Sequence, residues 1–163
     1  MEKKDLLALL EAENIPYTIK EHKAIYTVAE GETLNLPDID QAVKSLFIRD
    51  DRHENFFLAV LPLDARLDLK KMRKALAARR LAMAGAGELK TLLNLEPGAV
   101  TPLGLLNPGA AKVKLVMSAD LKNRQRVAVP FLSNEATLWL PLGSLISLLA
   151  AAGHGALWLD IAL

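Results

Sequence analysis

The stretch "QAVKSLFIRD", Gln41–Asp50, is an apolar run that one lysine interrupts. Its composition predicts a β-strand, and alternate side chains of a strand share a face. Lys44 therefore points the same way as Ala42, Leu46 and Ile48, toward the expected core. Lysine is rarely buried completely, and its aliphatic stem can cover apolar neighbours while the ammonium reaches water. From this strand alone, a surface role and a site role for Lys44 both stay open.

The flanking sequence predicts the elements that surround this strand. An apolar run at residues 55–63 follows the polar residues 50–55, which is the spacing of a β-hairpin. Before it, an amphipathic helix is expected from the leucines of residues 6–10, stopped at Asn14–Pro16 and followed by a short strand at 17–22. Thr27 is expected to cap a short second helix, which Gly31 limits.

The second half of the chain predicts more helices and strands in alternation. Asp68 is expected to cap a helix through residue 80, and a further helical turn covers 87–95. Residues 96–110 form a loop rich in Gly and Pro. Strands are expected at 112–118, 126–132 and 135–141, a helix at 142–152 stopped by Gly153, and a buried strand at 156–163. This order predicts a mixed α/β fold, a curled mixed β-sheet flanked by helices, as one domain over 1–163.

Composition excludes several classes of function. The chain has 52% hydrophobic and 24% charged residues, which is ordinary for a globular protein. Without cysteine there is no disulfide, thiolate metal site or cysteine nucleophile, and the three histidines lack zinc-ligand spacing, so no metal or other cofactor is expected. The net charge of +1 restricts any RNA contact to a local patch. No segment of about 18 apolar residues predicts a membrane span, and we expect a cytoplasmic protein.

Six segments together resemble one known family. They occur in the order found in the YbaK/ProX family, and they cover nearly the whole chain: "EHKAIYTVAEG" (21–31), "VKSLFIRD" (43–50), "LDLKKMRKAL" (67–76), "EPGAVTPLGLLN" (96–107), "LSNEATLWL" (132–140) and "AAGHGALWLDI" (151–161). Each segment alone is a weak signal, but six in register are specific. Within the family, the chain is most similar to the free-standing alanyl-tRNA(Pro) deacylases of the ProXp-ala type.

The resemblance implies an enzyme that hydrolyses the ester between a wrong amino acid and the terminal adenosine of tRNA(Pro). A proline-activating site cannot strongly reject a smaller amino acid, because each missing methylene changes binding by only about 1 to 3 kcal/mol. A second site must therefore remove the wrong product. The resemblance favours alanine, and a cysteinyl-tRNA(Pro) deacylase is the nearer alternative. The implied partner is the acceptor end of tRNA(Pro); the oligomeric state and any help from prolyl-tRNA synthetase stay open.

The resemblance also implies the site residues. Lys44 falls on the active-site lysine of the editing domains, where a cation anchors a phosphate or polarises the ester carbonyl. The segment from Gly98 to Pro102, which includes Thr101, matches the family's Gly-x-x-x-Pro loop, whose exposed N–H groups stabilise an oxyanion. A positioned water, helped by the ribose 2′-hydroxyl, then replaces a side-chain nucleophile. The substrate-binding residues implied are His22, Thr27, Leu46, Gly104, Leu105, Ser133 and Asn134.

A basic run in the helix after Asp68 is a candidate contact for the acceptor stem. Charged helix faces are most often solvated surface, but phosphate neutralisation supplies much of the affinity of RNA-binding proteins. The residues expected to contribute are Lys70, Lys71, Lys74, Arg79 and Arg80.

The chain departs from the family pattern at two neighbouring positions. The related proteins read His-Pro-Leu-Ser/Thr-Asn, whereas this chain reads Pro130-Phe131-Leu132-Ser133-Asn134. The missing histidine keeps two rivals open: a catalytically silent module that binds aminoacyl-tRNA, and a binder of a small metabolite.

Overall fold

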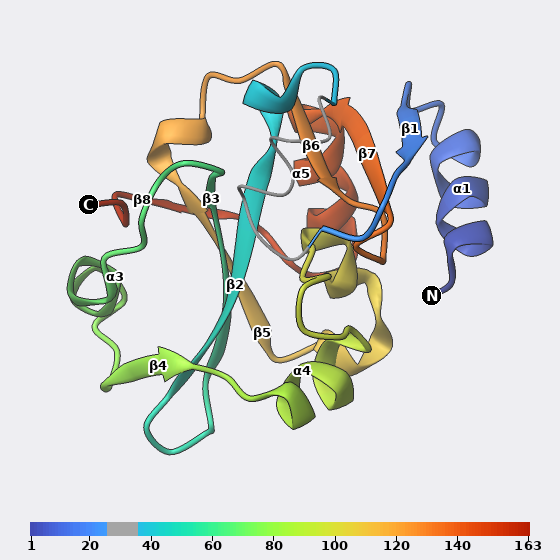
Figure 1. The fold of residues 1–163 in the computed structure, drawn as a ribbon. Helices are drawn as coiled ribbons and strands as arrows, with labels where there is room; N and C mark the ends of the chain where they lie inside the picture. The colour runs from blue at the N-terminus through green and yellow to red at the C-terminus, as the bar shows by residue number, and fades with distance from the viewer. Residues whose placement is uncertain (26–35) are drawn as a thin grey trace.

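The computed structural model describes residues 1–25 and 36–163 (Figure 1). In this part of the chain the strands form a five-stranded sheet in the order β4-β2-β3-β5-β8 and a three-stranded sheet in the order β1-β7-β6. The strands are β1 Thr18–Glu21, β2 Val43–Asp50, β3 Phe56–Pro62, β4 Leu81–Met83, β5 Val113–Ser118, β6 Arg126–Pro130, β7 Ala136–Pro141 and β8 Leu157–Leu159. The helices are α1 Lys3–Ala12, α3 Leu69–Leu76, α4 Ala86–Leu93 and α5 Leu142–Ala151.

The larger sheet is built around the predicted hairpin. β2 pairs with β3 antiparallel, with Lys44 opposite Leu61, while β3, β5 and β8 run parallel. All seven residues of β3 are buried, as expected for a strand covered on both faces. A single bridge between Ala42 and Ala128 joins this sheet to the smaller one.

The two faces of the larger sheet are covered by different elements. Val43 and Phe47 of β2 belong to the large core cluster, which also takes in side chains of α1, α4, α5, β6 and β7. Ile48 belongs to a smaller cluster with Met72 of α3, and Leu46 packs against it. Each fully buried large apolar side chain contributes about 1.5 to 3 kcal/mol. Apolar side chains on opposite faces of β2 thus belong to different core clusters.

The expected fold class, a mixed α/β fold with helices flanking a mixed sheet, is confirmed. The predicted first helix, the hairpin, the helix near residue 90, the strands of the second half and the helix before Gly153 are all present. Gly153 has φ +95°, which fits its role as a helix stop. The helix expected from Thr27 lies outside the described residues.

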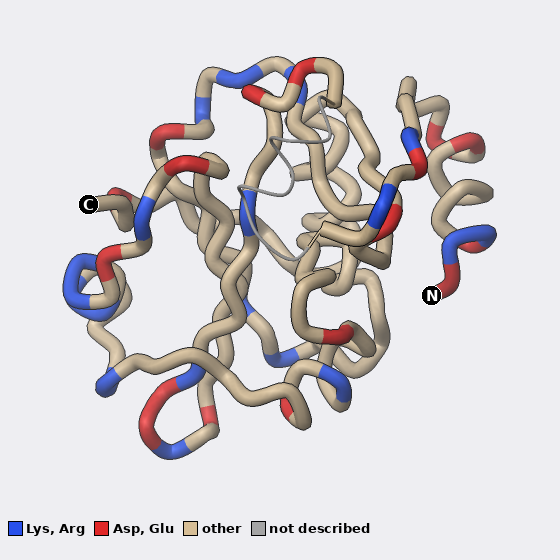
Figure 2. The backbone as a smooth tube through the Cα atoms, viewed as in Figure 1, with Lys and Arg blue, Asp and Glu red and all other residues tan. Residues whose placement is uncertain are grey.

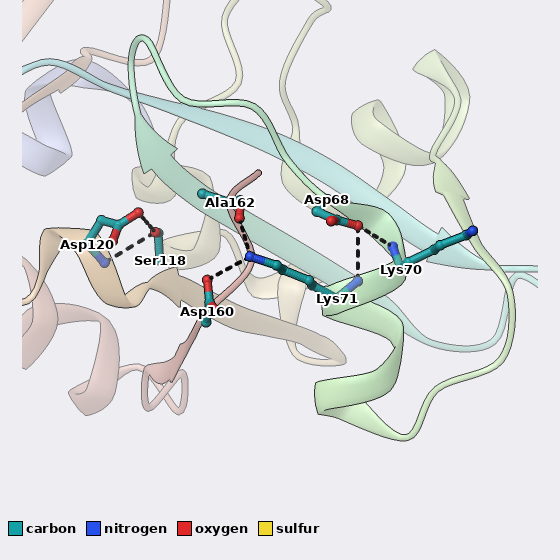
Figure 3. Close-up of polar contacts among 7 residues, drawn as sticks. All are labelled: Asp68, Lys70, Lys71, Ser118, Asp120, Asp160 and Ala162. Carbon is teal, nitrogen blue, oxygen red and sulfur yellow. Dashed lines mark hydrogen bonds and ion pairs between the residues drawn. The ribbon is translucent and has the colours of Figure 1, made fainter.

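The helix after Asp68 is shorter than predicted. The Asp68 carboxylate accepts hydrogen bonds from the backbone N–H groups of Lys70 and Lys71, as a helix cap does (Figure 3). The helix ends at Leu76, because Ala77 adopts a left-handed conformation with φ +49°. Arg79 and Arg80 are therefore outside it, and Leu81–Met83 forms a strand that the sequence analysis did not predict.

Two further expectations need correction. The loop at 96–110 is not wholly irregular, because it contains the 3-10 helices η2 Pro102–Leu106 and η3 Pro108–Ala110, each begun by a proline. The closing strand is three residues long and only partly buried, with Leu157 42% exposed, because it pairs with β5 alone at the edge of the sheet. None of the described helices is long and apolar enough to span a membrane.

Candidate functional site

A cavity of about 460 Å³ lies between the N-terminal half of β2 and the smaller sheet. The turn around η1 Ile39–Gln41, the ends of β6 and β7, the start of α4 and the loop at Pro97, Gly98 and Val100 complete its wall. Most of the lining is apolar. Its polar side chains among the described residues are His22, Lys44, Ser45, Ser133, Asn134 and Thr137. An apolar cavity of this size with a few polar groups is typical of a small-molecule site.

Lys44 and Gly98, which are 54 positions apart in the chain, line the same cavity. Lys44 is half-buried on β2, so its stem is covered while its position still gives access to the cavity. Gly98 is the third residue of a turn in which the Ala99 N–H donates to the Glu96 carbonyl. Its φ of +87° is a conformation that only glycine adopts without strain. The backbone at Gly98 can therefore approach a ligand closely.

His22 and Thr137 form a hydrogen-bonded pair in the cavity wall. His22 Nδ1 lies 2.7 Å from the Lys23 carbonyl oxygen, and Nε2 lies 2.8 Å from Thr137 Oγ1. A carbonyl can only accept, so Nδ1 carries a proton and donates to the Lys23 carbonyl. Thr137 faces Pro130 across β6 and β7. An imidazole thus lies one strand away from Pro130.

The Ser45 hydroxyl is buried with no hydrogen-bond partner among the described residues. Ser45 lies beside Lys44 in the sequence but projects from the other face of β2. Ser45 as a residue lines the cavity and is 9% exposed, but its hydroxyl oxygen has almost no accessible surface of its own. The sequence analysis did not select Ser45 or Thr137. A hydroxyl on the same strand face as Val43 and Phe47 is the signal that would have identified Ser45.

The predicted loop residues beyond Gly98 are placed in the core rather than in the cavity wall. Thr101 is completely buried, and its hydroxyl accepts from the Leu103 N–H, which caps η2. Pro102 and Leu105 are buried in the same helix. A Cβ on Gly104 would lie 2.6 Å from Leu95 Cδ1, so that glycine permits close packing. Thr101, Pro102, Gly104 and Leu105 therefore support the loop from the core side and do not line the cavity.

The other predicted substrate residues divide into two groups. Leu46, Ser133 and Asn134 line the cavity with His22, and the Asn134 carbonyl accepts from the Ile25 N–H. Thr27 lies outside the described residues.

The basic residues expected to bind tRNA are not in the cavity wall. In Figure 2 the basic residues of α3 lie on one side of β2, and the smaller sheet lies on the other side. Lys71 Nζ donates to the Ala162 carbonyl at 2.8 Å and lies 3.4 Å from Asp160 (Figure 3). Arg79 binds Asp51 through two hydrogen bonds of 2.7 and 3.1 Å, which lower the pKa of the aspartate. The remaining candidates, Lys70, Lys74 and Arg80, are exposed.

No group of three or more His, Asp or Glu side chains in the described ranges is arranged to hold a metal ion. The site chemistry that the described residues support is that of a cation, backbone N–H groups and neutral hydroxyls around an apolar cavity. Such groups can bind an ester and stabilise negative charge on its oxygen.

The structure defines a mixed α/β domain with an apolar cavity beside β2. A family profile described as "Aminoacyl-tRNA editing domain" matches residues 22–148. The chain therefore belongs to the aminoacyl-tRNA editing domain family, and the predicted family and enzyme class are confirmed.

Two relatives agree with this assignment. The chain is 34% identical over 152 residues to "Prolyl-tRNA editing protein ProX" of Acetoanaerobium sticklandii, with 93% of both chains covered. It is 27% identical to "Prolyl-tRNA synthetase associated domain-containing protein 1" of Danio rerio, over 93% of this chain and 83% of that one.

Two solved structures share the fold. A hypothetical protein matches with a TM-score of 0.75 and 23% identity, over 99% of this chain and 100% of the other. A candidate trans-editing enzyme for prolyl tRNA synthetase matches with a TM-score of 0.70 and 20% identity, over 96% of this chain and 95% of the other.

Proposed function

We propose that this protein is a trans-editing deacylase that hydrolyses mischarged tRNA(Pro), with Ala-tRNA(Pro) as its main substrate. The observation that carries the proposal is that Lys44 and the left-handed Gly98 line one apolar cavity. The similarity to a prolyl-tRNA editing protein supports the choice of tRNA.

The chemistry requires no side-chain nucleophile. Water attacks the carbonyl carbon of the aminoacyl ester, the bond to the ribose 3′-oxygen breaks, and the proton of the water passes to the leaving oxygen. Free alanine and uncharged tRNA(Pro) result. The neighbouring 2′-hydroxyl of the ribose helps to position the water.

Two groups stabilise the transition state in this proposal. Backbone N–H groups around Gly98 donate to the oxyanion, because the glycine lets the backbone come close. The Lys44 ammonium holds the terminal phosphate or polarises the ester carbonyl. Thr101, Pro102, Gly104 and Leu105 keep the loop in place from the core. Leu46, His22, Ser133 and Asn134 contact the substrate, and Thr27 is kept as a further proposed contact.

The acceptor stem contacts basic residues outside the cavity. Lys70, Lys74 and Arg80 are exposed and available, whereas Lys71 and Arg79 already bind protein oxygens. Neutralising Lys70, Lys74 and Arg80 should weaken tRNA binding and reduce the salt dependence of that binding. Prolyl-tRNA synthetase is a further proposed partner, and the cytoplasm is the proposed location because translation uses aminoacyl-tRNA there.

A deacylation panel tests the proposal. Purified protein is incubated with Ala-, Cys-, Ser- and Pro-tRNA(Pro), and release of the amino acid is followed for the wild type and Lys44→Ala. We expect hydrolysis of Ala-tRNA(Pro), sparing of Pro-tRNA(Pro) and loss of activity in the variant. Faster hydrolysis of Cys-tRNA(Pro) would shift the assignment to the cysteine type. No turnover of any mischarged tRNA would refute hydrolysis.

One observation favours a second candidate, a silent binding module. Pro130 lines the cavity where the family has a histidine, and it has no side-chain donor or acceptor. Under this alternative the protein binds aminoacyl-tRNA in a salt-dependent manner without hydrolysing it. Pro130→His would then create activity that the wild type lacks.

A further inference from the structure

The smaller sheet has one face in the core and one face toward the cavity. Ile19, Val129 and Leu138 pack in the large core cluster. Side chains alternate along each strand, so the residues next to these three project from the opposite face. That opposite face includes Pro130 and Thr137, which line the cavity. The cavity is therefore bounded on this side by the face of the sheet that the large core does not use.

Lys20 of β1 lies on the same face of the smaller sheet. It is paired with Thr137 in the antiparallel register, and directly paired residues share a face. The contact between His22 Nε2 and Thr137 Oγ1 supports this orientation, because His22 is two residues after Lys20. Lys20 is exposed and does not line the cavity. Its side chain therefore begins one strand beyond the cavity wall at Thr137.

The row of residues that crosses the cavity has a lysine at each end. β2 and β6 run parallel where the bridge between Ala42 and Ala128 joins them. Two residues further along these strands, Lys44 and Pro130 line the cavity from β2 and from β6. Lys20 is two strands beyond Pro130, which is about 10 Å at the usual strand spacing. A ligand that contacts Lys44 and leaves the cavity over the smaller sheet thus passes Lys20.

Three observations leave the charge of Lys20 available for an anion. None of the described residues that line the cavity is Asp or Glu. Glu21, the acidic neighbour of Lys20 on β1, projects from the other face of the strand. The ion pairs between described residues do not include Lys20. An anionic group of a bound ligand can therefore pair with this ammonium.

We infer that Lys20 binds the 5′-phosphate of the terminal adenosine while the aminoacyl ester lies in the cavity. The inference rests on the proposed function and assigns the phosphate to a second cation, so that Lys44 acts on the ester carbonyl alone. A phosphate diester carries one negative charge at neutral pH, and an exposed lysine can bind it through a charge-assisted hydrogen bond. Unpaired nucleotides separate this phosphate from the acceptor stem, so the proposed stem contacts on α3 are unaffected.

A cycle of two ligands and two proteins tests this inference by binding. The ligands are 3′-amino-3′-deoxyadenosine acylated with alanine, which resists hydrolysis, with either a free 5′-hydroxyl or a 5′-methylphosphate. Calorimetry gives their Kd values for the full chain. In the wild type we expect the methylphosphate to tighten binding about 3-fold to 10-fold, as one charge-assisted contact at an exposed site does.

Variants of Lys20 assign the effect to this side chain. Lys20→Met keeps an unbranched stem, so it should bind the phosphate-free ligand as the wild type does and should gain nothing from the methylphosphate. Lys20→Arg should keep the gain, because it keeps the charge. The control Lys114→Met should also keep it, since Lys114 is exposed on β5 and does not line the cavity. High salt should reduce the gain in the wild type.

Several results would overturn the inference. They are a methylphosphate that adds nothing in the wild type, a gain that persists in Lys20→Met, a gain that is lost equally in Lys114→Met, and failure of both ligands to bind. Loss of the gain in Lys44→Met but not in Lys20→Met would overturn it too, because Lys44 would then hold the phosphate.

These outcomes are separate from those of the deacylation panel. If the wild type hydrolyses Ala-tRNA(Pro) but the gain does not depend on Lys20, the proposed function holds and the role of Lys20 fails. If the gain depends on Lys20 without hydrolysis of any tRNA, the phosphate site holds and the protein is a binding module.

Discussion

The two halves of β2 differ in how their polar groups are satisfied. In the half that ends at Asp50, β4 covers the edge, and the buried Asp50 carboxylate accepts from the Glu54 N–H and the Asn55 side chain at 2.9 and 2.7 Å. These hydrogen bonds, that from Asn55 first, lower the pKa of Asp50 from 3.8 to about 2. In the half around Ser45, the edge is open toward the cavity and the hydroxyl has no partner among the described residues.

From this difference we infer that the half of β2 ending at Asp50 stabilises the fold, whereas the half around Ser45 borders the cavity. At the hairpin end, two further contacts join the hairpin to other parts of the chain. Arg79 binds Asp51, and His53 Nδ1 lies 2.9 Å from Glu88 of α4. A fully satisfied polar network stabilises one conformation. Buried polar groups without a hydrogen-bond partner destabilise the fold, and they are kept where function requires them.

The largest expected effect comes from removing the cation of the open half. Lys44→Met keeps an unbranched stem but removes the charge, so the hydrolysis rate of Ala-tRNA(Pro) should fall by about 100-fold to 1,000-fold, as for loss of one oxyanion-stabilising group. Single-turnover deacylation measures the rate. Lys114→Met is the control, because Lys114 is exposed on β5 and does not line the cavity. A rate within a factor of two of the wild type would remove Lys44 from the site.

The next effect concerns the glycine turn that faces the open half. Gly98→Ala should lower the free energy of unfolding by about 1 to 2 kcal/mol, because alanine is strained at a positive φ, and should also lower the deacylation rate. Gly153→Ala provides a matched control, since Gly153 has φ +95° and nothing within 4 Å of an added Cβ. Denaturant titration should show similar destabilisation of both variants. Equal losses of activity would indicate that strain alone is responsible.

A smaller effect sharpens the contrast in stability. Ser45→Ala removes a buried hydroxyl that has no partner among the described residues, so we expect the free energy of unfolding to rise by about 1 kcal/mol. Urea unfolding followed by circular dichroism measures the change. A clear loss of stability would mean that the hydroxyl is already satisfied in the free protein.

The smallest expected effect is a pH dependence of stability in the acidic range, and it concerns the half of β2 that ends at Asp50. The pKa of Asp50 is lower in the folded chain, so its contribution to stability is complete above pH 3.8 and disappears as pH falls through about 2. Asp50→Asn should therefore be less stable than the wild type near pH 6, and the two should converge toward pH 2. Urea midpoints measured across this range provide the comparison. If the difference in urea midpoint stayed constant down to pH 2, the lowered pKa of Asp50 would not be its cause.

Much of the fold followed from local sequence patterns. The period of the apolar residues predicted the β2–β3 hairpin, and Asp68 predicted the start of α3, because both signals act between neighbours in the chain. β4 was missed because three residues are too few to show a period, and its pairing partner in β2 is about 30 positions earlier in the chain. The end of α3 was misplaced because the left-handed turn at Ala77 has no glycine to mark it.

For the site, the residues alone left the role of Lys44 open, and the family resemblance directed attention to Lys44 and Gly98. The sequence by itself determined the mixed α/β fold, the hairpin and the absence of any cysteine nucleophile, since periodicity, capping and composition are local properties. Only the tertiary structure decided that Lys44 and Gly98 line one cavity, and that Thr101 and Leu105 lie in the core. It also decided that no strand of residues 1–25 and 36–163 pairs with the edge of β2 at Ser45. These facts depend on which strands fail to pair, and strand pairing is set by contacts between segments far apart in the chain.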